Sequence, residues 1–340
     1  MISPKKVILI TAGDPASIST EITIKAMQAK KINKNVNFVV VTDPILIEKY
    51  IHFVKSDIKI NLVKDRVKFC DYKDNFLNII PIQLKNQLTY GNPDTKHSHF
   101  IKNSIITSVN TYLNSIASAI VTNPINKHFM HKSGFNFEGH TDFLASISVK
   151  RKNPIMMLVT NELKTLPLTI HVPLKEVPKL ITKDLIYSKI KIAVEDLKTF
   201  FNIKIPSIIV TGLNPHAGEN GDFGDEEINV IKPAIDELKK LKNVLIDGPI
   251  SPDTAFLPTS RLNYDLVVCM YHDQALIPIK TLDFYNGVNV TLGLDFIRTS
   301  PDHGTGFDIA GKNIANPESL ISAINLAYKM SINQNNAQEN

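Results

Sequence analysis

Five of the ten histidines stand in short polar motifs whose residue types could do chemistry. Three imidazoles that leave coordination positions open make a Lewis-acid metal site. No two of these five are spaced i, i+4, so spacing alone does not identify ligands, and a single histidine is more often structural. The five are His140 in Gly-His-Thr-Asp, His171 in His-Val-Pro-Leu, His216 in Asn-Pro-His-Ala-Gly, His272 in Tyr-His-Asp-Gln and His303 in Asp-His-Gly-Thr. The others lie in lysine-rich or polar stretches and are expected at the surface: His52, His97, His99, His128 and His131.

Arginine is scarce, and one of the few arginines stands in a motif. Nearly all of the 38 basic residues are lysines, and the arginines are Arg66, Arg151, Arg261 and Arg298. Arg298 lies in Phe-Ile-Arg-Thr-Ser, where a planar guanidinium could grip a carboxylate or phosphate with two hydrogen bonds. The alternative is a structural salt bridge. Lys280 and Asn289 lie just upstream and could complete an anion site with His140 and Thr141.

These side chains must be positioned by a regular scaffold, and the chain alternates short apolar runs with segments of helical period. Apolar residues recur at helical spacing over 185–197 and 228–241. This alternation predicts an α/β fold with a mostly parallel sheet. Two further runs, 155–160 and 166–170, flank a polar turn and predict an antiparallel hairpin. The buried parallel strands are expected at Val7–Ile10, Phe38–Val41, Ile58–Val63, Ala119–Thr122, Ile208–Thr211, Val244–Ile246 and Leu266–Met270.

Polar, turn-forming segments follow four of the expected strands. In open α/β sheets ligands bind beyond the carboxyl ends of the strands, so these segments are candidates for the site. Taken singly, each is most simply an ordinary turn. Their joint occurrence, with histidines and aspartates among them, indicates function. The segments are 11–15, 122–127, 212–219 and 271–274.

Length and composition exclude several classes of protein. The 340 residues suffice for two domains with a core each, and 43% hydrophobic with 21% charged residues excludes a disordered or membrane protein. A net charge of +5 does not indicate nucleic acid, because the lysines are dispersed among acidic residues. The two cysteines form no CxxC pair, which excludes a disulfide framework and a thiolate zinc site. Without a signal-peptide core or a bilayer-spanning run, we expect a cytoplasmic protein.

Motifs spread in order over nearly the whole chain resemble those of one known family. They are Gly13–Ala16, Gly139–Ala145, Gly212–Glu219, Met270–Gln274, Gly287–Gly293, Phe296–Ser300 and Asp302–Thr305. The family is the 4-hydroxythreonine-4-phosphate dehydrogenases of vitamin B6 (pyridoxine 5'-phosphate) biosynthesis. The resemblance implies two α/β domains in the isocitrate/isopropylmalate dehydrogenase architecture, a site in the cleft between them, and a homodimer that shares the site. The expected domains are 1–130 with 282–340, and 131–281.

The resemblance also implies roles for individual residues. A divalent metal ion, Zn, Mg or Co, is expected on His171, His216 and His272. The phosphorylated substrate is expected to bind His140, Thr141, Lys280, Asn289 and Arg298. Residues 302–317 are similar to the adenosine-binding loop of the β-decarboxylating dehydrogenases, although no G-x-G-x-x-G follows a strand. This loop implies NAD, with NADP as an alternative, bound by Gly304, Thr305, Asp308 and Gly311.

The chemistry implied is oxidation of a secondary alcohol beta to a carboxylate, followed by decarboxylation. Hydride would pass to NAD, and the β-keto acid would lose CO2 to give 3-amino-2-oxopropyl phosphate. A proton acceptor is needed. The candidates, which the sequence does not rank, are Asp253, Asp273 and Lys127.

Two serines depart from the family pattern, and other activities stay open. Ser17 and Ser19 stand where the family usually has glycine, so a role that needs positive φ at these positions is not expected. A paralogue that oxidises threonate or erythronate 4-phosphate would use the same motifs. A phosphate acyltransferase of the same architecture would need neither metal nor NAD, and a three-histidine zinc hydrolase would need no nicotinamide.

Overall fold

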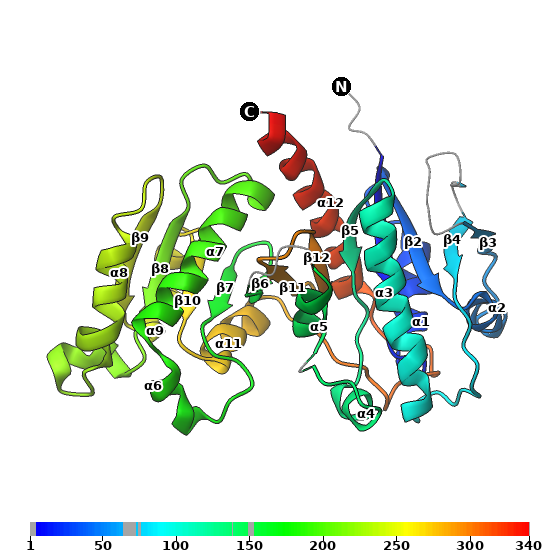
Figure 1. The fold of residues 1–340 in the computed structure, drawn as a ribbon, viewed down its shortest axis with the longest axis horizontal. Coiled ribbons are helices and arrows are strands. Elements are labelled where there is room, and N and C mark those ends of the chain that lie inside the picture. Colours follow the sequence, from blue (N-terminus) through cyan, green and yellow to red (C-terminus); the bar gives the residue numbers. More distant parts are fainter. Residues whose placement is uncertain (1–4, 64–72, 74–75, 138, 149–152, 340) are drawn as a thin grey trace. The chain divides into compact units, whose positions relative to one another are not determined.

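The computed structural model describes residues 5–63, 73, 76–137, 139–148 and 153–339 of the chain. The chain divides into two compact units (Figure 1). The first contains residues 1–152 and 294–332, and the second contains residues 153–293 and 333–340. Each unit has its own buried apolar core.

The strands of the first unit are parallel and follow the order β3-β4-β2-β1-β5-β12. Strands of a parallel sheet are covered on both faces and therefore need near-continuous apolar runs. In β1 the four residues from Val7 to Ile10 are all fully buried. The strands are β1 (Lys6–Thr11), β2 (Val36–Thr42), β3 (Lys59–Leu62), β4 (Phe76–Pro81), β5 (Ala117–Val121) and β12 (Arg298–Pro301).

The helices of the first unit begin at recognisable caps. The Asp43 carboxylate accepts from the N–H of Ile45 at the start of α2, and the Asn126 side chain accepts from the N–H of Phe129 at the start of α4. Figure 1 shows α3 lying along the strands of this unit, and α3 contacts β1, β2 and β5. The helices are α1 (Ser19–Gln28), α2 (Pro44–Phe53), α3 (Ser98–Asn114), α4 (Lys127–Lys132), α5 (His140–Ile147) and α12 (Glu318–Glu339), the last of which continues into the second unit.

The second unit has the strand order β11-β6-β7-β10-β8-β9. β7, β10, β8 and β9 are parallel neighbours, whereas β6 is antiparallel to both β11 and β7. The predicted hairpin is therefore confirmed as β6 and β7. The strands are β6 (Ile155–Val159), β7 (Lys164–Pro167), β8 (Ser207–Thr211), β9 (Leu245–Ile250), β10 (Leu266–Cys269) and β11 (Val288–Leu292).

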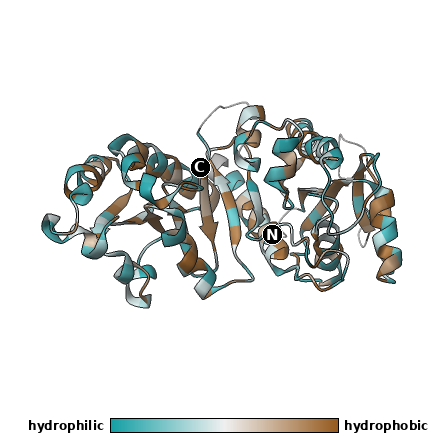
Figure 2. Cartoon of the chain, turned by 90° about the horizontal axis from the view of Figure 1, so that it is seen from below, coloured by the Kyte–Doolittle hydropathy of each residue, from teal (hydrophilic) through white to brown (hydrophobic). Residues whose placement is uncertain are grey.

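Helices of the second unit carry one apolar face and one polar face. In α7 the buried residues Ile186, Ile190, Ala193 and Leu197 recur at helical spacing, and Figure 2 shows teal and brown residues alternating on such helices beside largely brown strands. The Thr182 side chain caps α7 by accepting from the N–H of Leu185. The helices are α6 (Val177–Leu180), α7 (Lys183–Phe201), α8 (Lys232–Leu238), α9 (Pro252–Ala255), α10 (Pro258–Arg261) and α11 (His272–Leu282), with short turns η3 (Leu174–Glu176), η4 (Pro215–Gly221) and η5 (Glu227–Ile231).

The limits of the two units differ from the expected domain limits of 130/131 and 281/282. The first unit extends to residue 152 because Phe135, Phe143 and Leu144 pack into its core. Residues 282–293 belong to the second unit because β11 forms a ladder with β6. Residues 333–340 also group with the second unit.

The predicted α/β fold class is confirmed, and each predicted parallel strand corresponds to a strand of the structure. The sequence did not predict β4, β11 or β12. Among the described residues, no helix combines the length and the apolar character needed to cross a bilayer. Cys70, Arg66 and Arg151 lie outside the described residues.

Candidate functional site

Three neighbouring strands of the second unit each end shortly before one of the predicted metal ligands. β7, β10 and β8 are adjacent and parallel, so their carboxyl ends lie at the same edge of the sheet. His171 follows β7, His272 opens α11 directly after β10, and His216 lies in the turn after β8. The topology therefore brings the three histidine-bearing segments to one edge.

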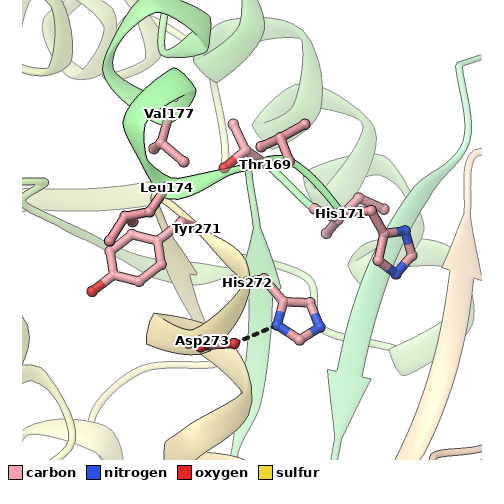
Figure 3. A pocket seen from close by; sticks show the side chains of 9 residues that line it. Thr169, His171, Leu174, Val177, Tyr271, His272 and Asp273 are labelled. Carbon is pink, nitrogen blue, oxygen red and sulfur yellow. Dashed lines mark hydrogen bonds and ion pairs between the residues drawn. The ribbon is translucent and has the colours of Figure 1, made fainter.

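His171 and His272 line one pocket at this edge (Figure 3). The pocket has a volume of about 370 Å³, and the centroids of the two imidazole rings are 6.0 Å apart. The Asp273 carboxylate lies 2.6 Å from Nδ1 of His272, which fixes the ring and leaves Nε2 to face a ligand. A carboxylate behind an imidazole is typical of metal-binding histidines. The remaining wall is partly apolar, with Val172, Leu174 and Val177.

His216 belongs to a turn with an unusual backbone. Six successive residues, 216–221, have positive φ, and only Gly218 and Gly221 among them are glycine. Each non-glycine residue in this region costs on the order of 1–3 kcal/mol, so the surroundings must impose the conformation. The buried Glu227 carboxylate does so in part, because its Oε1 accepts from the N–H groups of Leu213 at 2.7 Å and Asn214 at 2.8 Å. Glu227 thus holds residues 213 and 214, which lead into the His216 turn.

Asp253, a candidate proton acceptor, lies beside His216. A hydrogen bond from the Ser251 hydroxyl is the main cause that lowers the pKa of Asp253, and the nearby His216 contributes in the same direction. The Asp253 side chain is exposed. It can therefore act on His216 or on a molecule bound next to it.

The three imidazoles do not form a closed coordination group in the described residues, where no three His, Cys, Asp or Glu side chains stand close enough to hold one ion. Two of them share a pocket, and the third is fixed in a turn at the same sheet edge. The donors are nitrogen ligands, and one already has a carboxylate behind it. This donor set fits a divalent metal ion.

In the first unit, Arg298 is a buried cation at the start of β12. It is 4% exposed, and its Nε and Nη2 donate to the Thr122 hydroxyl at 3.1 Å and 2.6 Å. Burial lowers the pKa of Arg298 to about 10. A guanidinium whose plane is held by hydrogen bonds can contact a carboxylate or phosphate at two points.

His140 lies near two cations, Arg298 and Lys127. Burial, followed by the positive charges of Arg298 and Lys127, lowers the pKa of His140 well below its usual value, so the imidazole is neutral at pH 7. Its Nε2 is buried and has no hydrogen-bond partner among the described residues. An unsatisfied polar atom beside cations fits a bound anion. Thr141, which follows His140 in the first turn of α5, is half-buried.

The other predicted substrate residues, Lys280 and Asn289, belong to the second unit. Lys280 lies in the last turn of α11, with Nζ 5.2 Å from the centre of the Phe284 ring. Asn289 pairs with Leu158 across the β11–β6 ladder, and its Oδ1 is buried without a partner among the described residues. The predicted substrate set is therefore divided between the two units.

The predicted cofactor loop, residues 302–317, is anchored to the first loop of the chain. The N–H of Ile18 donates to the Thr305 carbonyl at 3.1 Å, and the Glu21 carboxylate accepts from the N–H of Ala315 at 2.6 Å. At Gly311, with φ of 76°, a Cβ would come within 2.9 Å of Tyr90. These contacts hold the loop near both ends. Asp308 is exposed between them, and Gly304, which precedes Thr305, is exposed too.

Ser17 and Ser19 hold the first loop through their hydroxyls. Neither has a positive φ, as expected from the absence of glycine. Ser17 Oγ donates to the Asp14 carbonyl at 2.6 Å and lies 2.7 Å from Ser19 Oγ. Gly13, by contrast, has φ of 70°, and a Cβ there would lie 2.7 Å from Cβ of Asn123. In this loop the left-handed conformation is confined to Gly13.

The prediction that His97 lies at the surface is wrong. His97 is 1% exposed, and its Nε2 lies 3.2 Å from the Gln87 carbonyl. It packs where η2 (Thr95–His97) passes into α3, close to Asp14. Burial raises the pKa of Asp14, and a backbone hydrogen bond from Ala16 and the nearby His97 only partly offset this rise. The residues next to His97 in the sequence are polar, so its burial could not be predicted from them. The other histidines predicted at the surface are exposed: His52, His99, His128 and His131.

Comparison with known proteins identifies the family. The family model described as "Pyridoxal phosphate biosynthetic protein PdxA" matches residues 34–327. The chain belongs to the PdxA family. A PdxA relative, the 4-hydroxythreonine-4-phosphate dehydrogenase of Caulobacter vibrioides, is 42% identical over 326 residues, which cover 94% of this chain and 96% of the relative. The enzyme of the same name from Methylorubrum extorquens strain PA1 is 40% identical over 336 residues, with 97% and 96% covered.

Solved PdxA structures share the fold. The crystal structure of 4-hydroxythreonine-4-phosphate dehydrogenase from Klebsiella pneumoniae matches with a TM-score of 0.85 and 35% identity, covering 96% of this chain and 99% of that one. The family predicted from the motifs is therefore confirmed. The roles of the individual site residues stay predictions.

Proposed function

We propose that this chain oxidises the secondary alcohol of 4-hydroxythreonine 4-phosphate with NAD, or NADP, and that the product decarboxylates to 3-amino-2-oxopropyl phosphate. This reaction serves pyridoxine 5'-phosphate synthesis. The observation that carries the proposal is the convergence of His171, His216 and His272 at one sheet edge of a PdxA-family chain. A metal ion bound there, Zn, Mg or Co, would supply Lewis-acid chemistry that acidifies the substrate hydroxyl.

The chain's own residues bind and orient the substrate in this proposal. Arg298 and neutral His140, together with Thr141, provide cationic and hydrogen-bonding contacts for an anionic group. Lys280 and Asn289 are proposed as further substrate-binding residues. Because Arg298 is buried, its contact with an anion is only weakly screened by solvent.

Oxidation of the alcohol removes one hydride and one proton, and each needs an acceptor. NAD, when bound, would supply the acceptor for the hydride of the alcohol C–H bond, and a base of this chain would take the hydroxyl proton. The β-keto acid then loses CO2, and the carbon left behind takes up a proton. Asp253, Asp273 and Lys127 are the candidates for these proton transfers. Asp273 is engaged with Nδ1 of His272, which assigns it first to orienting that ring.

The cofactor is proposed to lie on Gly304, Thr305, Asp308 and Gly311. The support is that the loop is held through Thr305 and Ala315 while Gly304 and Asp308 are exposed. A loop fixed in this way loses little conformational entropy when it binds a dinucleotide.

We further propose a cytoplasmic homodimer. Four large apolar side chains are exposed together on the second half of α11 and the following turn: Ile277 at 63%, Leu282 at 40%, Phe284 at 63% and Tyr285 at 59%. Apolar groups gathered in this way on a surface are typical of an interface. Sedimentation velocity of wild type and of a Phe284→Ser, Tyr285→Ser variant tests this, because the double variant should sediment as a monomer.

The test of the reaction is NADH formation from 4-hydroxythreonine 4-phosphate. Activity should disappear with a chelator and return with Zn, Mg or Co, and 3-amino-2-oxopropyl phosphate and CO2 should form in equal amounts. Preference for threonate or erythronate 4-phosphate would assign the chain to a paralogous activity. Acetyl transfer from acetyl-CoA to phosphate, with no NAD reduction, would assign it to the acyltransferases.

A further inference from the structure

Gln274, on the first turn of α11, links the ends of two histidine-bearing strands. Its Oε1 accepts from the N–H of Met270 at 2.7 Å, and its Nε2 donates to the Gly212 carbonyl at 3.0 Å. Met270 directly follows β10, and Gly212 directly follows β8. The amide therefore bridges the two strands just beyond the last rungs of their ladder, which end at Val268 and Val210.

The orientation of this amide is fixed by its partners. The Met270 N–H is a donor and can face only the carbonyl oxygen, whereas the Gly212 carbonyl can face only the NH2 group. The Thr211 hydroxyl lies 2.8 Å from Oε1 and is a second donor to it. Gln274 is 9% exposed, so a lost hydrogen bond would leave a buried group unsatisfied.

A second buried side chain extends the link to the third strand. Thr169 lies just after β7, and both its N–H and its hydroxyl donate to the Met270 carbonyl, at 3.2 Å and 2.8 Å. Met270 thus receives Thr169 on its carbonyl and Gln274 on its N–H. The result is a continuous buried chain of hydrogen bonds from β7 through β10 to β8.

Each link lies close in sequence to a predicted ligand. Thr169 is two residues before His171, Met270 is two before His272, and Gly212 is four before His216. Displacing one link would shift the backbone from which a histidine projects, because a close-packed interior transmits such strain.

We propose that Gln274 is a positioning residue that sets the spacing of the three histidines for the metal ion. The inference rests on the proposed metal site and adds a residue that acts through the backbone rather than as a ligand. Gln274→Met removes the whole amide. Gln274→Glu keeps an acceptor for Met270 and Thr211 but sets a carboxylate oxygen against the Gly212 carbonyl, so its effect should fall on the His216 turn.

The experiment titrates the metal-free full-length protein with Co²⁺ and follows both the binding heat and the visible absorption, whose intensity reports the coordination number. Outer-shell partners of metal ligands typically change metal affinity 10- to 100-fold. We expect a Kd raised about 10-fold or more in both Gln274 variants, with altered absorption bands. Thr169→Val, which keeps the backbone N–H, should give a smaller shift.

Thr165→Val is the matched control. Its hydroxyl is fully buried and donates to the Ala275 carbonyl in the same helix α11 at 3.1 Å, but it makes no hydrogen bond to Thr169, Met270 or Gly212 in the described residues. It should lower the thermal stability as a buried hydroxyl deletion does and leave Co²⁺ affinity unchanged. If the Gln274 variants bind Co²⁺ as wild type does, the positioning role is wrong and the metal site stands. If wild type itself binds no Co²⁺, the proposed metal site fails and the inference with it.

Discussion

Arg298 donates two hydrogen bonds, from Nε and Nη2, to the single hydroxyl of Thr122. Arg298 opens β12 and Thr122 directly follows β5, and the parallel register of the two strands sets Arg298 opposite Ile120, two residues before Thr122. The pair fixes the plane of the guanidinium. A fixed plane is what two-point recognition of a phosphate or carboxylate requires.

Arg298→Lys should therefore weaken substrate binding although the charge is kept. An ammonium cannot reproduce the fork, and loss of a charged hydrogen bond costs about 1.5–3 kcal/mol, or roughly 10- to 100-fold in KM. Steady-state kinetics with 4-hydroxythreonine 4-phosphate measure this. Arg261→Lys is the control, because Arg261 pairs with Glu162 in the second unit and should keep a wild-type KM. An unchanged KM in Arg298→Lys would remove Arg298 from the substrate site.

His140 should make stability depend on pH. Its folded-state pKa is depressed by burial and by the neighbouring cations, so below about 6.5 the unfolded chain binds a proton that the folded chain does not. The stability present above this pH is then lost as the pH falls toward the folded pKa. Urea unfolding of wild type and His140→Asn between about pH 5 and 8 tests this. The variant should lose less stability over that range, and parallel curves would contradict the assignment.

His216→Ala should abolish metal-dependent turnover while the fold is kept. The turn is held by Glu227 and not by the imidazole, so circular dichroism and the unfolding midpoint should change little. Turnover with saturating metal measures the loss, which we expect to exceed about 100-fold because one of the three proposed ligands is gone. His52→Ala removes an exposed histidine of the first unit and should leave turnover intact. Full activity in His216→Ala would exclude it as a ligand.

Gly218→Ala should destabilise the second unit. Its φ is 79°, and a Cβ would lie 2.8 Å from Glu227 Oε2 and 2.9 Å from the Gly224 carbonyl. Gly134 has φ of 85° with nothing within 4 Å of a Cβ, so Gly134→Ala carries the backbone strain alone, about 1 kcal/mol. The free energy of unfolding should fall by about 1–3 kcal/mol more in Gly218→Ala than in Gly134→Ala. Equal losses would mean that the turn relaxes around the new methyl group.

The sequence predicted the scaffold well where burial on both faces leaves continuous apolar runs, as in Val7–Ile10 and Leu266–Met270. β12 escaped prediction because Arg298–Pro301 is polar in type yet fully buried. A strand that buries Arg, Thr and Ser has neither alternation nor an apolar run to mark it. Its burial depends on partners such as Thr122, which are remote in sequence.

In the candidate site, too, features marked by the local sequence could be predicted, and features that depend on residues remote in sequence could not. The candidate histidines could be selected from the sequence because their motifs stand at strand ends, and their role as ligands stays a prediction. Gln274 lay inside one of those motifs, but its role depends on Gly212 and Thr211, which only the strand order brings close. Glu227 was missed because it is one acidic residue among several in a helical stretch, and only the folded turn shows that it is buried.

The serine pair of the first loop has a consequence for the unfolded chain. Glycine samples more backbone conformations than serine, so each glycine replaced by a residue that fits the native φ lowers the entropy lost on folding, by about 0.4–1 kcal/mol. Ser17 and Ser19 both fit, and their hydroxyls are satisfied inside the loop. This loop, which anchors residues 302–317, is therefore less costly to order than its glycine-rich counterpart. In this loop the scarcity of glycine stabilises the fold by lowering the conformational entropy of the unfolded chain.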